Sequence, residues 1–219
     1  MTREEFCERH WGYYLILEKD FLEIERYISF ELGNNYLYTN ASKKTKAIDN
    51  SKCYSNEFIK QYQIICSEVD VVLKSICEEI NVGSTADKME DYTEEILNEW
   101  SDIVNQKVKV RGIELQPFMN WSRKPQYKSP DWWTPYNGVK HKRLQNYKKA
   151  NLKNTMNSLA GLFILEQYFS RYIGNKTGEK DVPNDVSNLF EMVGFNTRYS
   201  VLGKNSYFDN NNGDMFINC

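Results

Sequence analysis

The residues of this chain best suited to chemistry lie in one short basic segment around its second histidine. On a helix, Asn137 and His141 are four residues apart and share a face. Lys140 lies beside His141, and neighbouring cations favour a neutral imidazole that can act as a base. We therefore predict His141, Lys140 and Asn137 as catalytic residues, with Lys142 and Arg143 binding a phosphodiester ligand. An Asn–His pair could equally form an internal network that orients this helix.

Aromatic and amide side chains surround the same segment. Trp133 and Tyr136 are predicted to bind the ligand by stacking on bases. Asn151, Asn154 and Asn157 repeat every three residues along an otherwise apolar helix, where Asn rarely occurs without a hydrogen-bonding reason. This polar stripe is expected either to line a pocket with the histidine or to face water. Asn151 and Asn154 are accordingly predicted as ligand-binding residues.

Charge is strongly segregated along a chain whose formal net charge is −2. Residues 54–104 carry three Lys against twelve Asp or Glu, whereas residues 123–154 carry nine Lys or Arg against one Asp. Such a dense basic cluster makes a local positive field. One interpretation is that it packs against the acidic helix of the same molecule or of a second copy. The other is that it binds phosphate, although a pI of 5.8 is not typical of a dedicated nucleic-acid binder.

Motifs for other common chemistries are absent from the sequence. It contains no GxGxxG, GxxxxGK[ST], HExxH or GxSxG. A zinc site needs four ligands, or three and a water, and only Cys7 and His10 share a helical face at suitable spacing. Because no second pair has a matching spacing, we expect neither a metal site nor a cofactor.

Length and composition indicate a globular protein of one domain, or of one domain with an appendage. The 219 residues are 41% hydrophobic and 14% aromatic, which excludes wholesale disorder and permits a packed core without disulfides. The five cysteines are odd in number and form no CxxC pair, and the first residues are charged. These features predict a cytoplasmic location. No apolar run approaches the length of a membrane span, so no membrane partner is expected.

Apolar residues spaced by three and four predict three helices in the first half of the chain. The first is expected at about 8–32, ended by Gly33. The second starts near Ser55 and continues to about residue 80, with seven apolar positions on one face. A shorter acidic helix is predicted at about 86–99.

The pattern changes after residue 106. Alternating residues predict a short strand at 107–115. Residues 117–135 hold four of the five prolines and three tryptophans, which predicts a loop that packs against the bundle. A helical pattern then extends from Tyr136 to Ile173, as one helix or two.

The C-terminal part differs in kind. Residues 174–184 are rich in turn formers, and 186–193 are predicted as a short helix. Two or three short strands follow, which could pair with the strand at 107–115, and Asn212-Gly213 favours a hairpin. We therefore predict a helical bundle domain at 1–173 and a strand-containing appendage at 174–219.

The segment Tyr136-Asn-Gly-Val-Lys-His141-Lys-Arg143, leading into a long Ala- and Leu-containing helix, resembles the closing helices of HEPN-like proteins. The resemblance covers residues 132–172, together with the helical layout. It implies a mainly α fold, a HEPN-like helical bundle of four to five helices, here with the short strand near 107–115 and the appendage. It also implies a homodimer that acts in a microbial defence or toxin–antitoxin system, with an antitoxin or another protein as partner.

Active members of this superfamily are metal-independent endoribonucleases that use Arg-x(4–6)-His on one helix, and many relatives are inactive. Here the positions that would carry the Arg are Thr134, Pro135 and Tyr136, so the motif is a degenerate Asn-x-x-Lys-His. Lys140 and its basic neighbours would then have to stabilise the charge that develops at phosphorus. The resemblance implies binding of RNA or a nucleotide, with endoribonuclease activity, or alternatively a non-catalytic scaffold of the same fold that binds a partner.

Overall fold

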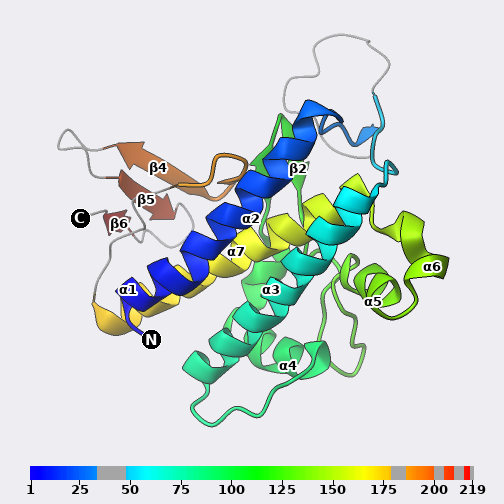
Figure 1. Ribbon diagram of the computed structural model, residues 1–219. Coiled ribbons are helices and arrows are strands. Elements are labelled where there is room, and N and C mark those ends of the chain that lie inside the picture. The colour runs from blue at the N-terminus through cyan, green and yellow to red at the C-terminus, as the bar shows by residue number, and fades with distance from the viewer. Residues whose placement is uncertain (34–47, 179–185, 200–204, 210–214, 218–219) are drawn as a thin grey trace.

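The fold is mainly helical and carries several short strands (Figure 1). The computed structural model describes residues 1–33, 48–178, 186–199, 205–209 and 215–217. The predicted mainly α class is confirmed. Within those ranges, no helix combines the length and the apolar character that crossing a bilayer requires.

Three long helices form the core: α2 (Gly12–Leu22), α3 (Asn56–Ile80) and α7 (Leu152–Thr177). They lie side by side, and α3 has its most extensive contacts with α7 (Figure 1). The prediction for α3 is confirmed at both ends. Its first turn is capped by Ser55, whose hydroxyl accepts from the Phe58 N–H at 3.1 Å. Ile65, Val69 and Val72 are fully buried, as one apolar face of a helix requires.

The prediction of one helix at 8–32 is wrong at both ends. The structure has α1 (Arg3–Phe6), a π-helical turn (Cys7–Trp11), α2 and a 3₁₀ turn (Glu23–Arg26). Beyond that turn the chain folds back, and Leu32 bridges to Asp49. Phe30 and Leu32 reach the core from this non-helical segment, so the helical spacing of Leu32 was coincidental.

The acidic helix α4 (Met89–Glu99) confirms the prediction for 86–99 with a start three residues later, and a 3₁₀ turn (Ser101–Asn105) follows it. The predicted single strand at 107–115 is instead a hairpin of β1 (Val108–Val110) and β2 (Ile113–Leu115). Its turn needs positive φ at Arg111 (48°) and Gly112 (79°), which separates the two strands.

The helix predicted at 186–193 is absent, and Glu191–Met192 form strand β3, which pairs antiparallel with β1. The carboxylate of Glu18 explains this conformation, because it accepts from the Ser187 hydroxyl and from the Asn188 N–H at 2.8 Å. The strands predicted beyond residue 193 do not pair with 107–115 among the described residues; β3, from the segment predicted as a helix, pairs with β1 instead.

A second antiparallel sheet confirms the predicted C-terminal strands. It consists of β4 (Phe195–Tyr199), β5 (Asn205–Asp209) and β6 (Met215–Ile217) in that order. The Asn212-Gly213 turn lies outside the described residues. The division at residue 173 stays a prediction, although β3 joins the C-terminal part to the hairpin at 108–115.

The helical pattern predicted for 136–173 is divided into several pieces. These are α5 (Trp133–His141), α6 (Arg143–Asn146), a 3₁₀ turn (Tyr147–Lys149) and α7. The chain leaves helical geometry at Lys142 (φ −138°, ψ 56°). A second break lies before Leu152, whose N–H donates to the Cys53 carbonyl at 2.9 Å. At its other end α7 passes the predicted stop at Gly174 and ends before Gly178, which has a φ of +77°.

Candidate functional site

The predicted site follows a loop that is fixed to the bundle by buried tryptophans. The Trp121 indole donates to the Thr93 hydroxyl of α4 at 2.7 Å, and the Trp132 indole donates to the Pro117 carbonyl at 3.0 Å. Trp132 also lies directly against α7, because a Cβ on Gly161 would come within 2.8 Å of its ring. The loop at 117–132 therefore sets the position of α5, as predicted.

Helix α5 turns two of the predicted ligand-binding residues into the core. Trp133, Tyr136 and Val139 recur every three residues and are buried. The Tyr62 hydroxyl of α3 donates to the Trp132 carbonyl, and its ring meets that of Tyr136 edge to face. Burial raises the pKa of Tyr136 to about 12. Trp133 and Tyr136 thus anchor α5, and the prediction that they stack on a ligand is corrected. A sequence does not distinguish aromatic residues that stack on a ligand from aromatic residues that pack in the core.

The opposite face of α5 presents the predicted catalytic residues to solvent. Asn137, Lys140 and His141 are all exposed. In the described part of the chain, no hydrogen bond joins Asn137 to His141, so the internal network proposed as an alternative is not formed. Lys140 is held loosely, with its Nζ 5.7 Å from the centroid of the Tyr136 ring. The structure therefore brings these three side chains to one surface without building an enclosed site around them.

Six cations follow one another on α5, α6, the 3₁₀ turn and the start of α7. We call this the cationic surface, and it consists of Lys140, Lys142, Arg143, Lys148, Lys149 and Lys153. Residues 132–154 contain no Asp or Glu. Among the described residues, none of the six has an ion-pair partner, and all are exposed. Asn146 ties these short elements together, because it packs on Gly138 of α5 and donates to the Lys142 carbonyl at 2.9 Å.

The earlier cations of the same basic segment behave differently. Lys124 forms an ion pair with Glu90 of α4 at 2.9 Å, and its backbone N–H donates to Glu94. The ion pair raises the pKa of Lys124 and lowers that of Glu90. Arg123 donates to Asn98, and Lys128 lies 3.5 Å from Asp131. The part of the basic segment at Arg123 and Lys124 therefore packs on the acidic helix, as the first interpretation expects. Phosphate binding by the cations at 140–153 stays a prediction.

One aromatic ring on the cationic surface was overlooked in the sequence. Tyr54, just before α3, is 44% exposed, and the Nζ of Lys148 lies 5.8 Å from its ring centroid. The ring of Tyr147 supports it edge to face at 5.5 Å, and the Tyr147 hydroxyl donates to Asn56 at 2.8 Å. Sequence offered little warning, because Tyr54 is almost one hundred residues from the cations that it joins.

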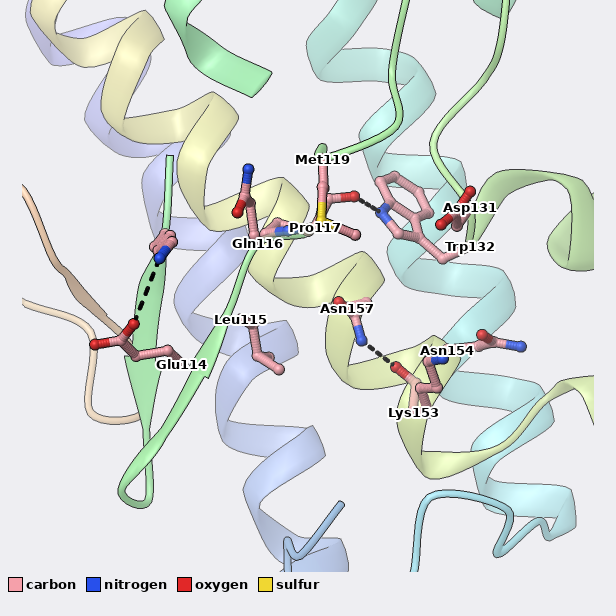
Figure 2. A pocket seen from close by; sticks show the side chains of 11 residues that line it. Glu114, Leu115, Gln116, Pro117, Met119, Asp131, Trp132, Lys153, Asn154 and Asn157 are labelled. Atoms are coloured by element: carbon pink, nitrogen blue, oxygen red, sulfur yellow. Dashed lines mark hydrogen bonds and ion pairs between the residues drawn. The ribbon is translucent and has the colours of Figure 1, made fainter. Parts of the chain in front are cut away.

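A pocket of about 380 Å³ opens beside this surface (Figure 2). The end of the β1–β2 hairpin, the loop after it and the first turns of α7 form its walls. Seven of its eleven lining residues have charged or amide side chains, including the Lys107–Glu114 ion pair at 3.8 Å. Trp132 and Met119 supply apolar contact. Lys153 belongs both to this lining and to the cationic surface, so the two features are continuous.

The predicted asparagine stripe is divided between a structural role and this pocket. Asn151 caps α7, because its side chain accepts from the Asn154 N–H at 3.0 Å. Asn154 and Asn157 line the pocket (Figure 2), and their amides donate to the carbonyls of Lys149 and Lys153, both at 2.8 Å. Of the two expectations for the stripe, the polar pocket is therefore closer, but His141 is not among the residues that line it.

A second polar cluster lies inside the bundle, away from the basic segment. His10 of the π-helical turn, Glu68 of α3 and Glu166 of α7 place ligand atoms within 4.8 Å of one another. Their relative exposures are 5%, 9% and 0%. Burial raises the pKa of the Glu166 carboxyl well above its usual range, with a further contribution from the charge of Glu68. Burial also lowers the pKa of His10. We call these residues the buried triad.

The buried triad was missed because its members come from three helices that only the tertiary fold brings together. One sequence signal did exist. Glu166 is the single charged residue between Lys153 and Arg171, in a stretch that is otherwise apolar or small and polar. A lone carboxylate on a buried helix face requires a partner or a proton.

Comparison with family models, with curated proteins and with solved structures finds no match to this chain.

Proposed function

We propose that this protein binds RNA, or another phosphate-bearing ligand, through the cationic surface, as a HEPN-like protein of a microbial defence or toxin–antitoxin system. One observation carries the proposal: six cations between residues 140 and 153 lack ion-pair partners among the described residues, whereas Lys124 of the same basic segment is paired with Glu90 of α4. The HEPN-like part of the proposal rests on the resemblance of residues 132–172 and on the mainly helical fold.

The geometry suits a backbone-directed mode of binding. Exposed Lys and Arg side chains neutralise phosphates without reading sequence, and an accessible aromatic ring provides a platform for a base. Tyr54 takes the stacking role that the buried Trp133 and Tyr136 cannot fill. The adjoining pocket offers amide and charged groups at which an exposed base or a terminal phosphate could bind.

Salt dependence is the direct test of binding. We expect the affinity for a fluorescently labelled single-stranded RNA, followed by anisotropy, to fall steeply between about 50 and 200 mM salt. The double variant Lys148→Gln/Lys149→Gln should reduce the slope of log K against log salt by about 1.4, because each contact to a single strand contributes about 0.7. The matched control is Lys124→Gln/Lys128→Gln, which removes two paired cations and should leave the slope unchanged. Equal effects of the two double variants would contradict the proposal.

Cleavage is a separate question, and His141 is its focus. An imidazole base next to Lys140 and Lys142 could deprotonate a ribose 2′-hydroxyl that attacks the adjacent phosphate. The bond from phosphorus to the 5′-oxygen of the next nucleotide then breaks, leaving a 2′,3′-cyclic phosphate and a 5′-oxygen that takes a proton from water. The exposed side chains offer no preorganised donor for the developing charge, and the loss of one such donor costs roughly 10²–10³ in rate. We therefore expect at most slow cleavage. Incubation with cellular RNA in EDTA, beside His141→Ala, decides the matter: cleavage by the original protein alone establishes a metal-independent ribonuclease, and intact RNA in both samples leaves binding as the function.

One observation favours the alternative of a non-catalytic, partner-binding protein. Leu144 follows Arg143 in the chain and is 86% exposed. A protein partner such as an antitoxin that covered this side chain would remove its apolar surface from water. Leu144→Ser should then weaken the partner complex while leaving RNA affinity unchanged, whereas a surface dedicated to RNA shows no effect of this substitution in either assay.

A further inference from the structure

The buried triad contains potential metal-ligand atoms that lack hydrogen-bond partners among the described residues. Both carboxylate oxygens of Glu166 and the Nδ1 atom of His10 are buried, and among the described residues none of the three has a hydrogen-bond partner. Buried polar atoms nearly always have one. Each of these side chains points into the same small space, because their ligand atoms lie within 4.8 Å of one another.

The surroundings of the triad are apolar. The imidazole of His10 packs between two rings, parallel to Phe6 with centroids 6.1 Å apart and edge-on to Phe169 at 5.3 Å. Two carboxylates in such a place repel each other and lose their hydration, which is the reason that the pKa of Glu166 is raised. By contrast, another buried carboxylate of the bundle, that of Glu18 on α2, accepts hydrogen bonds from Tyr14, from Ser187 and from a backbone N–H. The fold satisfies one buried carboxylate completely and leaves the other without partners.

Backbone geometry supports a role for this place. His10 lies in the π-helical turn at Cys7–Trp11, between α1 and α2. Such turns insert one residue into a helix and occur frequently at functional sites. The inserted residue changes the direction in which the side chains of this turn project from the helix, and here the His10 side chain faces α7. The distortion and the unpartnered atoms are two independent observations at one location.

We propose that the buried triad binds one divalent transition-metal ion, with one nitrogen ligand from His10 and carboxylate ligands from Glu68 and Glu166. An imidazole with two carboxylates is a ligand set suited to Zn²⁺, Mn²⁺, Fe²⁺ or Co²⁺. A neutral imidazole, two carboxylates and a divalent cation sum to zero charge, which is the condition for burying them together.

Binding requires a small contraction of the site. Ligands bound at about 2.0–2.2 Å from one ion lie closer together than 4.8 Å, so the three side chains must move toward the ion. Glu68, the member nearest to solvent, is the entry point. We expected no metal site from the sequence, because the ligand spacing was judged along single helices. The three ligands of this site come from three different helices.

The alternative occupant of the site is a proton. If Glu166 is protonated, it donates a hydrogen bond to Glu68 or to His10 and no ion is needed. The two possibilities predict different results with the same protein, because a shared proton creates no saturable affinity for metal.

The test is titration of the full chain with Co²⁺ after removal of metals by a chelator, in the presence of a reducing agent. We expect one equivalent to bind saturably, with visible absorption bands of a nitrogen–oxygen site, no thiolate charge-transfer band, and a rise in Tm. The chain has two histidines, which provide a matched pair of variants. His10→Gln should weaken binding by at least about 100-fold, since even residues behind the ligands cost 10–100-fold, and His141→Gln should bind like the original protein.

Glu166→Gln preserves side-chain volume and removes a ligand charge, so it should fold and fail to bind; Glu68→Gln gives the same readout if that variant is unstable. The proposal is overturned if no saturable binding is seen, or if His10→Gln and the Glu variants bind as the original protein does. These outcomes are independent of the RNA cleavage experiment, which is carried out in EDTA.

Discussion

The cationic surface and the buried triad both contain charged or polar groups that lack protein partners among the described residues, but water reaches only the first. A lysine on the surface keeps its hydration, so the six cations cost the fold little while no ligand is bound. The carboxylate of Glu166 is fully buried and loses that hydration. Incomplete pairing therefore has opposite consequences in the two regions: the surface can stay vacant, whereas the triad must take up a proton or a cation.

The largest effect is expected from Glu166→Gln in the metal-free protein. The pKa of Glu166 is raised in the folded state, so the unfolded chain releases its proton first as pH rises. The original protein therefore loses stability as pH increases above the ordinary carboxyl pKa of 4.5, by up to about 1.4 kcal/mol per pH unit until the folded-state pKa is reached. Glu166→Gln should lose less stability over this range, because only Glu68, whose pKa burial also raises, still contributes from the triad, and urea unfolding at a series of pH values measures the difference.

The free energies of unfolding of two proteins must be compared, because His10 also contributes to the pH dependence of each. Its pKa is lowered, so the folded state loses stability as pH falls below 6.5, and this contribution is present in both proteins. Subtracting the two curves removes the part of this contribution that does not depend on Glu166. A difference that stays constant from acid to alkaline pH would contradict the assignment of a raised pKa to Glu166.

A smaller loss of unfolding free energy is expected from Gly161→Ala, which tests whether the loop at 117–132 packs tightly against α7. The added methyl group would lie 2.8 Å from the Trp132 ring and 3.3 Å from Phe118, and neither buried ring can move freely. We expect destabilisation of about 1–3 kcal/mol, despite the better helix propensity of Ala. Denaturant unfolding measures the loss. A variant more stable than the original protein would show that the loop at 117–132 is not pressed against α7.

Tyr54→Ala should affect binding and leave the fold intact. Stacking on one base contributes about 1–3 kcal/mol, so the affinity for single-stranded RNA should fall by roughly 5- to 150-fold. The ring is 44% exposed, and we expect little change in Tm. Tyr54→Phe is the control, since it keeps the ring and should retain the affinity. If Tyr54→Ala binds RNA normally, the cationic surface acts through charge alone.

The smallest effect separates a structural asparagine from a ligand-binding one. Asn151→Ala removes the cap of α7 and should cost about 1 kcal/mol of unfolding free energy with no change in RNA affinity. Asn151→Ser retains a capping oxygen and should recover most of the stability. A loss of affinity at constant stability would instead place Asn151 in the binding site, as its sequence pattern first indicated.

The fold could be predicted where burial follows a helical period over a long stretch. In α3 the apolar residues lie on one face from Phe58 to Ile76, and no other arrangement buries them all. The prediction at 8–32 used the same rule and was wrong, because Leu32 is buried by a chain that turns back and pairs with Asp49. The helix at 186–193 was wrong because Glu18, far away in sequence, holds Ser187 and Asn188 in another conformation.

The candidate site divides in the same way. An excess of cations over acids can be counted in a sequence, and residues 132–154 contain no acid at all. Which aromatic rings face solvent cannot be read from a sequence: Tyr136 was expected to be accessible and is buried, whereas Tyr54, for which nothing was expected, is exposed. The buried triad depends on three helices and on the phase of a π-helical turn, and neither quantity is visible in the spacing of His10, Glu68 and Glu166.

The packing of the N-terminal helices on α7 has a consequence for the order of folding. Phe6 meets Phe169 at 5.6 Å, and Tyr14 meets Phe163 at 5.7 Å, so residues from the two ends of the bundle form one aromatic layer. During synthesis at 5–20 residues per second, the first helices wait roughly 10–30 s before α7 is made. Contacts this distant along the chain also slow the search for the native state. The nascent chain therefore exposes its aromatic N-terminal face throughout most of translation, and the bundle closes as a late, concerted step.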